Sequence, residues 1–281
     1  MAGIRLSTGL LAVVLLTAVD ASRLAAADGI VSLDTRPGVT QRFLVLEPKR
    51  AVNGAVIMFP PEEGLVQFKK NKKGRFKVKR GGWIGQTIDM YRERGIAVAV
   101  VEPPSDRLGH GMDTDFRKSD EHAEDLGHVI AHMTDRTGFK PFLVATCRAT
   151  HSASSVATKV ERETISGVVL ASSRSRGKRG SILDAIIPGR LQSRVLFVHH
   201  VDDDCAGAPY SGVTKLVAAF DAADVKVVSV SGGWRTAERK QKRGCGANGS
   251  HKFYGSQEIT VRAITDWMAG RAVADRLDAG E

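Results

Sequence analysis

Short apolar runs alternate with longer helical stretches along most of this chain, and this alternation restricts the folds it can adopt. The expected strands are residues 42–48, 53–60, 95–104, 141–146, 166–173, 194–200 and 225–232, the first two as neighbours. The expected helices are residues 83–94, 119–137, 152–163, 212–223 and 257–272. Continuous Val, Ile and Leu runs separated by helices are typical of a mostly parallel sheet with helices on both faces. The sequence therefore predicts the α/β class.

The N-terminal residues 1–27 have the features of a cleaved secretory signal peptide. Arg5 precedes the apolar run at residues 10–19, and Ala25 and Ala27 provide a small-x-small cleavage site. The apolar run is about half as long as a bilayer span requires. We therefore expect a secreted or periplasmic protein with one domain at residues 28–281 and no transmembrane span.

The chain contains three cysteines, Cys147, Cys205 and Cys245. In an oxidising compartment two of them would normally pair and one would stay free, but counting does not decide which. Their spacing does not match a zinc site, and we expect neither a metal nor another cofactor.

Three groups of residues that can carry chemistry lie just after expected strands or just before a helix. Cys147 stands between strand 141–146 and the next helix, and Asp202, Asp203 and Asp204 follow strand 194–200. His251 precedes the last helix. Because active sites of parallel sheets form at the carboxyl ends of the strands, these residues are candidates for one site.

In this order, nucleophile, acid and histidine, the chain resembles secreted bacterial α/β-hydrolases of the dienelactone-hydrolase-like or esterase-like kind. The resemblance covers nearly all of residues 42–272 and implies the α/β-hydrolase fold. Cys147 stands where the G-x-S-x-G motif has its serine, with alanine in place of both glycines. The resemblance implies a triad of Cys147, Asp203 and His251, with Asp202 as the second candidate for the acid.

The chemistry of such a triad can be stated from the residue types. A nearby imidazole converts a thiol into the nucleophilic thiolate, and a carboxylate holds that imidazole in the right tautomer. The oxyanion is expected to meet the backbone N–H of Arg148 and an N–H from the loop after strand 53–60. Pro61 has no N–H, so Glu62 or Glu63 must supply this second donor.

Assembly of the triad also predicts the disulfide. Cys205 follows the acid loop and Cys245 precedes His251 by six residues. When Asp203 and His251 come within hydrogen-bond distance, their loops meet at one edge, where the two cysteines can pair. Cys147 then stays free.

Positive charge is concentrated in three clusters, residues 68–80, 174–179 and 235–243, within a chain of net charge +10. Each cluster follows an expected strand, so together they can form a basic rim that attracts an anionic substrate or an anionic envelope surface. In the first cluster, the expected anion-binding residues are Lys69, Lys70, Lys72, Lys73 and Arg75. Nucleic acid is not the expected partner, since aromatic residues are only 6% of the chain and the protein is exported.

Two functions remain open from the sequence. The intact order of Cys147, Asp203 and His251 favours a hydrolase of an ester, lactone or thioester. The alternative is a catalytically weak or inactive protein of the same fold that binds an anionic polymer or envelope surface. The elbow alanines and the loop at Pro61 and Glu62 favour this alternative.

Overall fold

The computed structural model describes residues 27–161, 163–191, 193–220, 224–233, 244–245 and 249–280. The expected signal peptide, apart from Ala27, and the basic cluster at residues 235–243 lie outside the described residues. In the part of the chain that is described, no helix has both the length and the apolar character needed to cross a bilayer.

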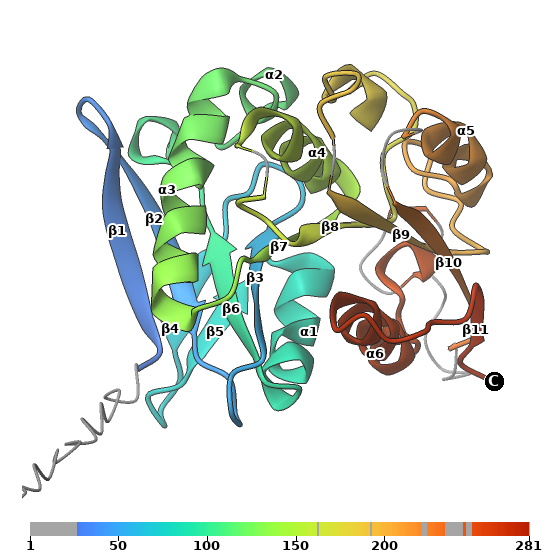
Figure 1. The fold of residues 1–281 in the computed structure, drawn as a ribbon, viewed down its shortest axis with the longest axis horizontal. Helices are drawn as coiled ribbons and strands as arrows, with labels where there is room; N and C mark the ends of the chain where they lie inside the picture. The colour runs from blue at the N-terminus through green and yellow to red at the C-terminus, as the bar shows by residue number, and fades with distance from the viewer. Residues whose placement is uncertain are drawn as a thin grey trace, which may run out of the picture.

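A nine-stranded sheet runs through the molecule in the order β1-β2-β6-β3-β7-β8-β9-β10-β11 (Figure 1). From β6 to β11 in this order, neighbouring strands are parallel, and β2 and β1 are added antiparallel beside β6. The strands are β1 (Gly29–Arg36), β2 (Val39–Leu46), β3 (Gly54–Phe59), β6 (Ile96–Val101), β7 (Phe142–Thr146), β8 (Gly167–Ala171), β9 (Arg194–His200), β10 (Val225–Ser231) and β11 (Arg276–Asp278). The mostly parallel sheet expected from the sequence is confirmed.

The strands β2 and β3 are not neighbours, so that expectation was wrong. Strand β6 lies between them, antiparallel to β2 and parallel to β3. Every residue of β3 is buried, because β6 and β7 cover its two edges and helices cover its faces. Proximity along the chain did not determine proximity in the sheet.

Helices cover both faces of the sheet and form two hydrophobic layers with it, as expected. Helices α1 (Gly82–Glu93) and α6 (Gln257–Met268) contribute to one layer, and α3 (Asp120–Thr137), α4 (Thr150–Lys159) and α5 (Val213–Ala218) contribute to the other. Successive strand residues point to opposite faces, so Val56 packs in the first layer and Ile57 in the second. The remaining helices are α2 (Thr114–Arg117) and short 3-10 turns at Ser105–Arg107, Cys147–Ala149, Ile182–Asp184, Tyr210–Gly212 and Ser250–Lys252.

Capping residues determine where the long helix α3 begins and ends. Ser119 caps its first turn by accepting a hydrogen bond from the N–H of His122, and Asp120 and Glu121 place negative charge at the positive end of the helix. Gly138 ends the helix with a φ of 78°, a conformation that glycine adopts at little cost.

The first basic cluster forms a β-hairpin of β4 (Gln67–Lys70) and β5 (Phe76–Lys79), which is not among the strands expected from the sequence. Phe68 and Val78 face each other across the hairpin and pack against the layer that contains α1 and α6. Lys69 and Lys77 form the next opposed pair, and both are exposed. The alternation of apolar and basic residues therefore gives this hairpin one packed face and one solvated face.

Candidate active site

Cys147 occupies the turn between β7 and α4, at the carboxyl end of a buried parallel strand. Its φ is 54°, in the left-handed region that non-glycine residues rarely adopt. The turn is fixed on its helical side by Thr150, whose hydroxyl donates a 2.6 Å hydrogen bond to the Cys147 carbonyl. Such strain persists only where surrounding structure maintains it, and it is frequent at active sites.

The alanines that replace the two glycines of the elbow motif lie in ordinary backbone. Ala145 is inside β7, and Ala149 has a φ of −67°. Both are fully buried in the hydrophobic layer that contains α4. The unusual conformation in this motif therefore falls on Cys147, and the additional methyl groups belong to the core.

Asp203 and His251 meet at the carboxyl end of the sheet, in the interior of the protein. Nδ1 of His251 lies 2.9 Å from Oδ2 of Asp203, and both side chains are completely shielded from solvent. Asp202 instead has a side chain 69% exposed. Asp204 accepts a hydrogen bond from the N–H of Gly244. Of the three consecutive aspartates, Asp203 is therefore the one that contacts the histidine.

A second histidine, His199, holds the same carboxylate. Its Nε2 lies 2.9 Å from Oδ2 of Asp203 and 2.9 Å from the carbonyl of Ala208. Both neighbours are acceptors, so Nε2 carries the proton. Oδ1 of Asp203 accepts from the N–H of Cys205 at 3.0 Å. His199 was not predicted as a site residue from the sequence, where its only signal is its position at the end of a strand, four residues before the acid.

The backbone of His251 is also fixed, by the residue that directly follows β8. The hydroxyl of Ser172 donates a 2.8 Å hydrogen bond to the His251 carbonyl. Ser172 has a φ of 43°, and Phe253, two residues after the histidine, has a φ of 53°. The hydrogen bond from Ser172 therefore fixes the short turn Ser250–Lys252 that carries the imidazole, and the left-handed Phe253 ends this turn.

The two partners have strongly shifted pKa values. Burial raises the pKa of Asp203, but hydrogen bonds from His199 and His251 outweigh it and bring the pKa down to about 2. Burial lowers the pKa of His251, whereas the hydrogen bond to Asp203 and then the interaction with Cys147 raise it, to about 9 overall. At neutral pH the site therefore contains an ionised Asp203 beside a protonated His251.

The other nitrogen of the ring, Nε2 of His251, is buried and makes no hydrogen bond to any described residue. Cys147, a free thiol with 4% of its surface exposed, is close enough to His251 to contribute to its raised pKa. The geometry therefore brings together the three residues Cys147, Asp203 and His251, with one ring nitrogen left for further chemistry.

The pKa of His251 predicts how the free energy of unfolding depends on pH. A folded-state pKa above the unfolded value of about 6.5 stabilises the protein below pH 6.5, and this stabilisation is lost as the pH rises through about 9. The wild type is expected to lose up to about 3 kcal/mol more than His251→Gln between these values. Asp203 stays ionised over the whole range. Urea unfolding of both proteins at pH 6 and pH 10 measures this difference, and equal losses would contradict the assignment.

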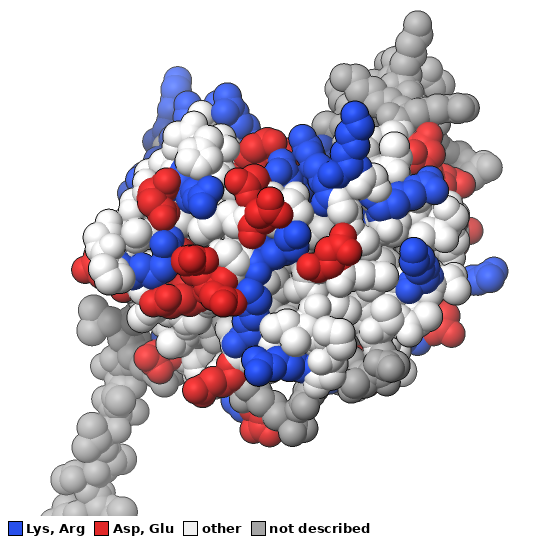
Figure 2. All heavy atoms as spheres, turned by 90° about the horizontal axis from the view of Figure 1, so that it is seen from above, with Lys and Arg blue, Asp and Glu red and all other residues white. Residues whose placement is uncertain are grey.

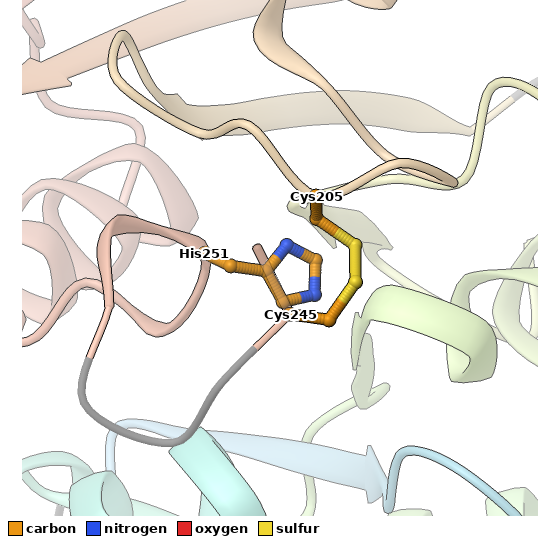
Figure 3. A group of neighbouring side chains, drawn as sticks. All are labelled: Cys205, Cys245 and His251. Carbon is orange, nitrogen blue, oxygen red and sulfur yellow. A yellow bond between two sulfur atoms is a disulfide. The ribbon is translucent and has the colours of Figure 1, made fainter. Parts of the chain in front are cut away.

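The disulfide expected from the sequence is confirmed. Cys205 and Cys245 are bonded, with their Cα atoms 4.7 Å apart. Both sulfur atoms and a nitrogen of His251 lie within 4.8 Å of one another, and Figure 3 shows the imidazole beside the bridge. The bridge therefore connects the loop of the acid directly to the surroundings of the base. Because its sulfurs are bonded to each other, they are not available as thiolate ligands.

The loop after β3 lies close to the elbow, as expected for an oxyanion site. Oε1 of Glu63 accepts a 2.8 Å hydrogen bond from Nη1 of Arg148, the residue after Cys147. Glu62, with a φ of 52°, has its carboxylate 3.5 Å from Nη1 of Arg179. The carboxylates of Glu62 and Glu63, close to the expected oxyanion, are thus each paired with an arginine, which offsets their negative charge.

The face shown in Figure 2 carries both positive and negative charge. This view looks at the molecule from above Figure 1, and acidic side chains lie between the basic ones. The hairpin bearing the expected anion-binding residues packs beside α1, whereas the Cys147 turn leads into α4, on the opposite face of the sheet. Those residues are Lys69, Lys70, Lys72, Lys73 and Arg75, and none of them has an ion pair with a described residue.

Comparison with known proteins finds similarity at the level of three-dimensional structure. No protein-family model matches the chain. No curated protein sequence matches it either.

A dienelactone hydrolase from Anabaena variabilis superposes with a TM-score of 0.59 at 13% identity, covering 87% of this chain and 97% of that one. An α/β serine hydrolase without a lid from Xanthomonas campestris has a TM-score of 0.55 at 13% identity, covering 87% and 94%. A serine hydrolase homologue from Coxiella burnetii has a TM-score of 0.54 at 14% identity, covering 85% and 96%. The chain therefore has the α/β-hydrolase fold.

Proposed function

We propose that this protein is a secreted hydrolase of esters, lactones or thioesters that uses Cys147 as its nucleophile. The observation that carries the proposal is the buried 2.9 Å contact between Asp203 and His251. Among the described residues Nε2 of His251 has no partner, and the buried free thiol of Cys147 lies near this histidine. The similar solved structures add support, because they include a dienelactone hydrolase and serine hydrolases of the same fold.

The mechanism starts from an ionised Asp203 and a protonated His251. The Cys147 thiolate attacks the acyl carbon, and the resulting oxyanion is stabilised by the N–H of Arg148 and an N–H from the Glu62–Glu63 segment. The protonated His251 then gives its Nε2 proton to the leaving alcohol or thiol. In the second half, neutral His251 takes a proton from water, which attacks the thioester and releases the acid. Asp203 stays ionised and holds the ring by Nδ1 throughout.

An arginine near the nucleophile supports an anionic substrate. Arg174 is only 8% exposed, and it lies near Cys147. It forms no ion pair within the described ranges, where its Nη2 donates to the carbonyl of Arg176. A nearly buried cation without a carboxylate partner favours a substrate that brings a negative charge with it.

The test is whether Cys147 carries an acyl group during turnover. The mature protein mixed with p-nitrophenyl acetate or butyrate is expected to show a burst of nitrophenol and an acyl group on the Cys147 peptide by mass spectrometry. Cys147→Ala is the control and is expected to show neither. Equal turnover by Cys147→Ala, or acylation at another residue, would reject the proposal.

The hairpin lysines, which have no ion pair with a described residue, favour one alternative, the binding of an anionic polymer or envelope surface without catalysis. The same comparison distinguishes the two functions. A protein that binds heparin in a salt-sensitive way, but whose Cys147 never becomes acylated, would support the alternative.

A further inference from the structure

We propose that Arg117 positions the loop after β3 so that it presents a backbone N–H to the oxyanion. This inference rests on the proposed hydrolase function. Arg117 acts through the backbone of the loop, without touching the substrate, and is therefore a positioning residue. Neither the sequence pattern nor the triad accounts for it.

Arg117 is the last residue of α2 and is completely buried. Its Nη2 donates to the carbonyl of Glu62 at 2.8 Å and to that of Pro60 at 3.2 Å. Its Nε donates to the carbonyl of Met112 at 3.3 Å. No carboxylate of the described chain forms an ion pair with it. Burying a guanidinium among carbonyl groups is costly. Burial, with the nearby charge of Arg148, accordingly lowers the pKa of Arg117 to about 9.

The hydrogen bonds of Arg117 set the direction of a specific peptide group. There is no cis peptide bond in the described chain, so the C=O of Glu62 and the N–H of Glu63 point in opposite directions. Holding the Glu62 carbonyl on Arg117 therefore points the Glu63 N–H away from the guanidinium. This N–H donates to no backbone carbonyl of the described residues, and neither does that of Glu62. Within the described ranges the loop thus keeps two N–H donors without a backbone acceptor, and Arg117 determines the orientation of one.

Other features of the loop require the same support. Glu62 has a φ of 52°, a strained conformation for a residue with a side chain. Gly64 has a φ of 75°, and a Cβ there would lie 2.4 Å from the Met112 methyl group and 3.3 Å from Nη2 of Arg117. The loop is therefore closely packed over the guanidinium, which stabilises a backbone conformation that would otherwise relax.

Arg117 also connects this loop to the helix that follows the nucleophile. Its Nη1 donates a 2.8 Å hydrogen bond to the hydroxyl of Ser152, in the first turns of α4 and five residues after Cys147. The two N–H groups expected to meet the oxyanion come from the elbow and from the loop. One guanidinium is therefore hydrogen-bonded to both segments and fixes the distance between them.

The experiment compares two reactions of the same thiol. Acylation by p-nitrophenyl butyrate creates an oxyanion, whereas alkylation by iodoacetamide does not. In Arg117→Lys, which keeps the charge but loses the planar fork, acylation is expected to fall by about 100-fold, the effect of losing an oxyanion donor. Alkylation of Cys147 is expected to stay within about twofold of the wild type, because it needs only the thiolate. Arg136→Lys, at the end of α3, is the matched control and should change neither rate.

Ser152→Ala provides a milder variant in case Arg117→Lys does not fold. It removes only the connection to α4, and acylation is expected to fall by roughly 5- to 10-fold with alkylation unchanged. If the rates of acylation and alkylation fall equally, or if a folded variant keeps its acylation rate, the role of Arg117 is rejected but the proposed hydrolase function is not. A wild type that is alkylated but never acylated would reject the proposed function and this inference together.

Discussion

Asp203→Asn is expected to lower kcat for ester hydrolysis by on the order of 1,000-fold. Oδ2 of Asp203 contacts a nitrogen of both His199 and His251, and its Oδ1 accepts from the N–H of Cys205. An asparagine has only one acceptor oxygen. If its NH₂ group faces His251, Nδ1 must accept and the proton moves to Nε2, so the ring no longer acts as a base. If the NH₂ group instead faces Cys205, it points at the backbone N–H of Cys205, which is also a donor, and that hydrogen bond is lost. A serine triad loses about 10⁴-fold in this substitution, and a thiol, being more acidic, depends less on the base.

The adjacent Asp202 offers a matched control for this prediction. Asp202→Asn removes the same charge from the next position of the chain, but its side chain is largely exposed and makes no contact with His251. We expect kcat to stay within about twofold of the wild type. Circular dichroism at the assay temperature verifies that both variants are folded. A similar decrease of kcat in both variants would mean that kcat depends on the net charge and not on the contact with His251.

Removing the bridge is expected to lower the free energy of unfolding by about 4 kcal/mol and Tm by roughly 10 °C. The bond closes a loop with a sequence separation of 40, and the loss of chain entropy in the unfolded state accounts for this magnitude. The test variant is Cys205→Ala/Cys245→Ser, since Cys205 is buried and Cys245 is exposed. Thermal unfolding with and without a reductant measures the change.

At temperatures below its Tm, where it is still folded, the same variant is expected to have a lower hydrolase activity than the wild type. The reason is that the bridge lies against the imidazole of His251. Cys147→Ala controls for the loss of a cysteine as such and should keep most of the wild-type Tm. Reduction should destabilise the wild type and Cys147→Ala alike and leave the bridge-free variant unaffected. A bridge-free variant as stable as the wild type would contradict the prediction.

The buried elements were predictable because their residue pattern alone determines them. Strand β9 is where the sequence placed it, and β7 and β8 differ by at most two residues at each end, because a continuous apolar run can be satisfied only inside a sheet. Strands β1 and β11 were missed. Both lie at the edges of the sheet, where exposed polar residues interrupt the apolar pattern.

The residues of the candidate site also fall into a group that was predictable from the sequence and a group that was not. Cys147, Asp203 and His251 were identifiable because each follows or precedes an element in a fixed order. His199, Ser172 and Arg117 were not. Ser172 and Arg117 act on backbone carbonyl groups of residues far away in the sequence, and the contact of His199 with Asp203 belongs to no motif. The hydroxyl of Ser172, for example, bonds the backbone of a residue 79 positions away. Such contacts leave no pattern in the sequence.

The Cys205–Cys245 bond gives the chain a second covalent path between acid and base. Along the backbone, Asp203 and His251 are 48 residues apart. Through the bond, the path needs only the two residues to Cys205 and the six from Cys245. A protease cut between the two cysteines would therefore leave acid and base in one covalently connected molecule. Insertions between Cys205 and Cys245 would lengthen the backbone path from acid to base but not the path through the disulfide. The segment between the two cysteines can therefore change in length while the acid and the base stay linked.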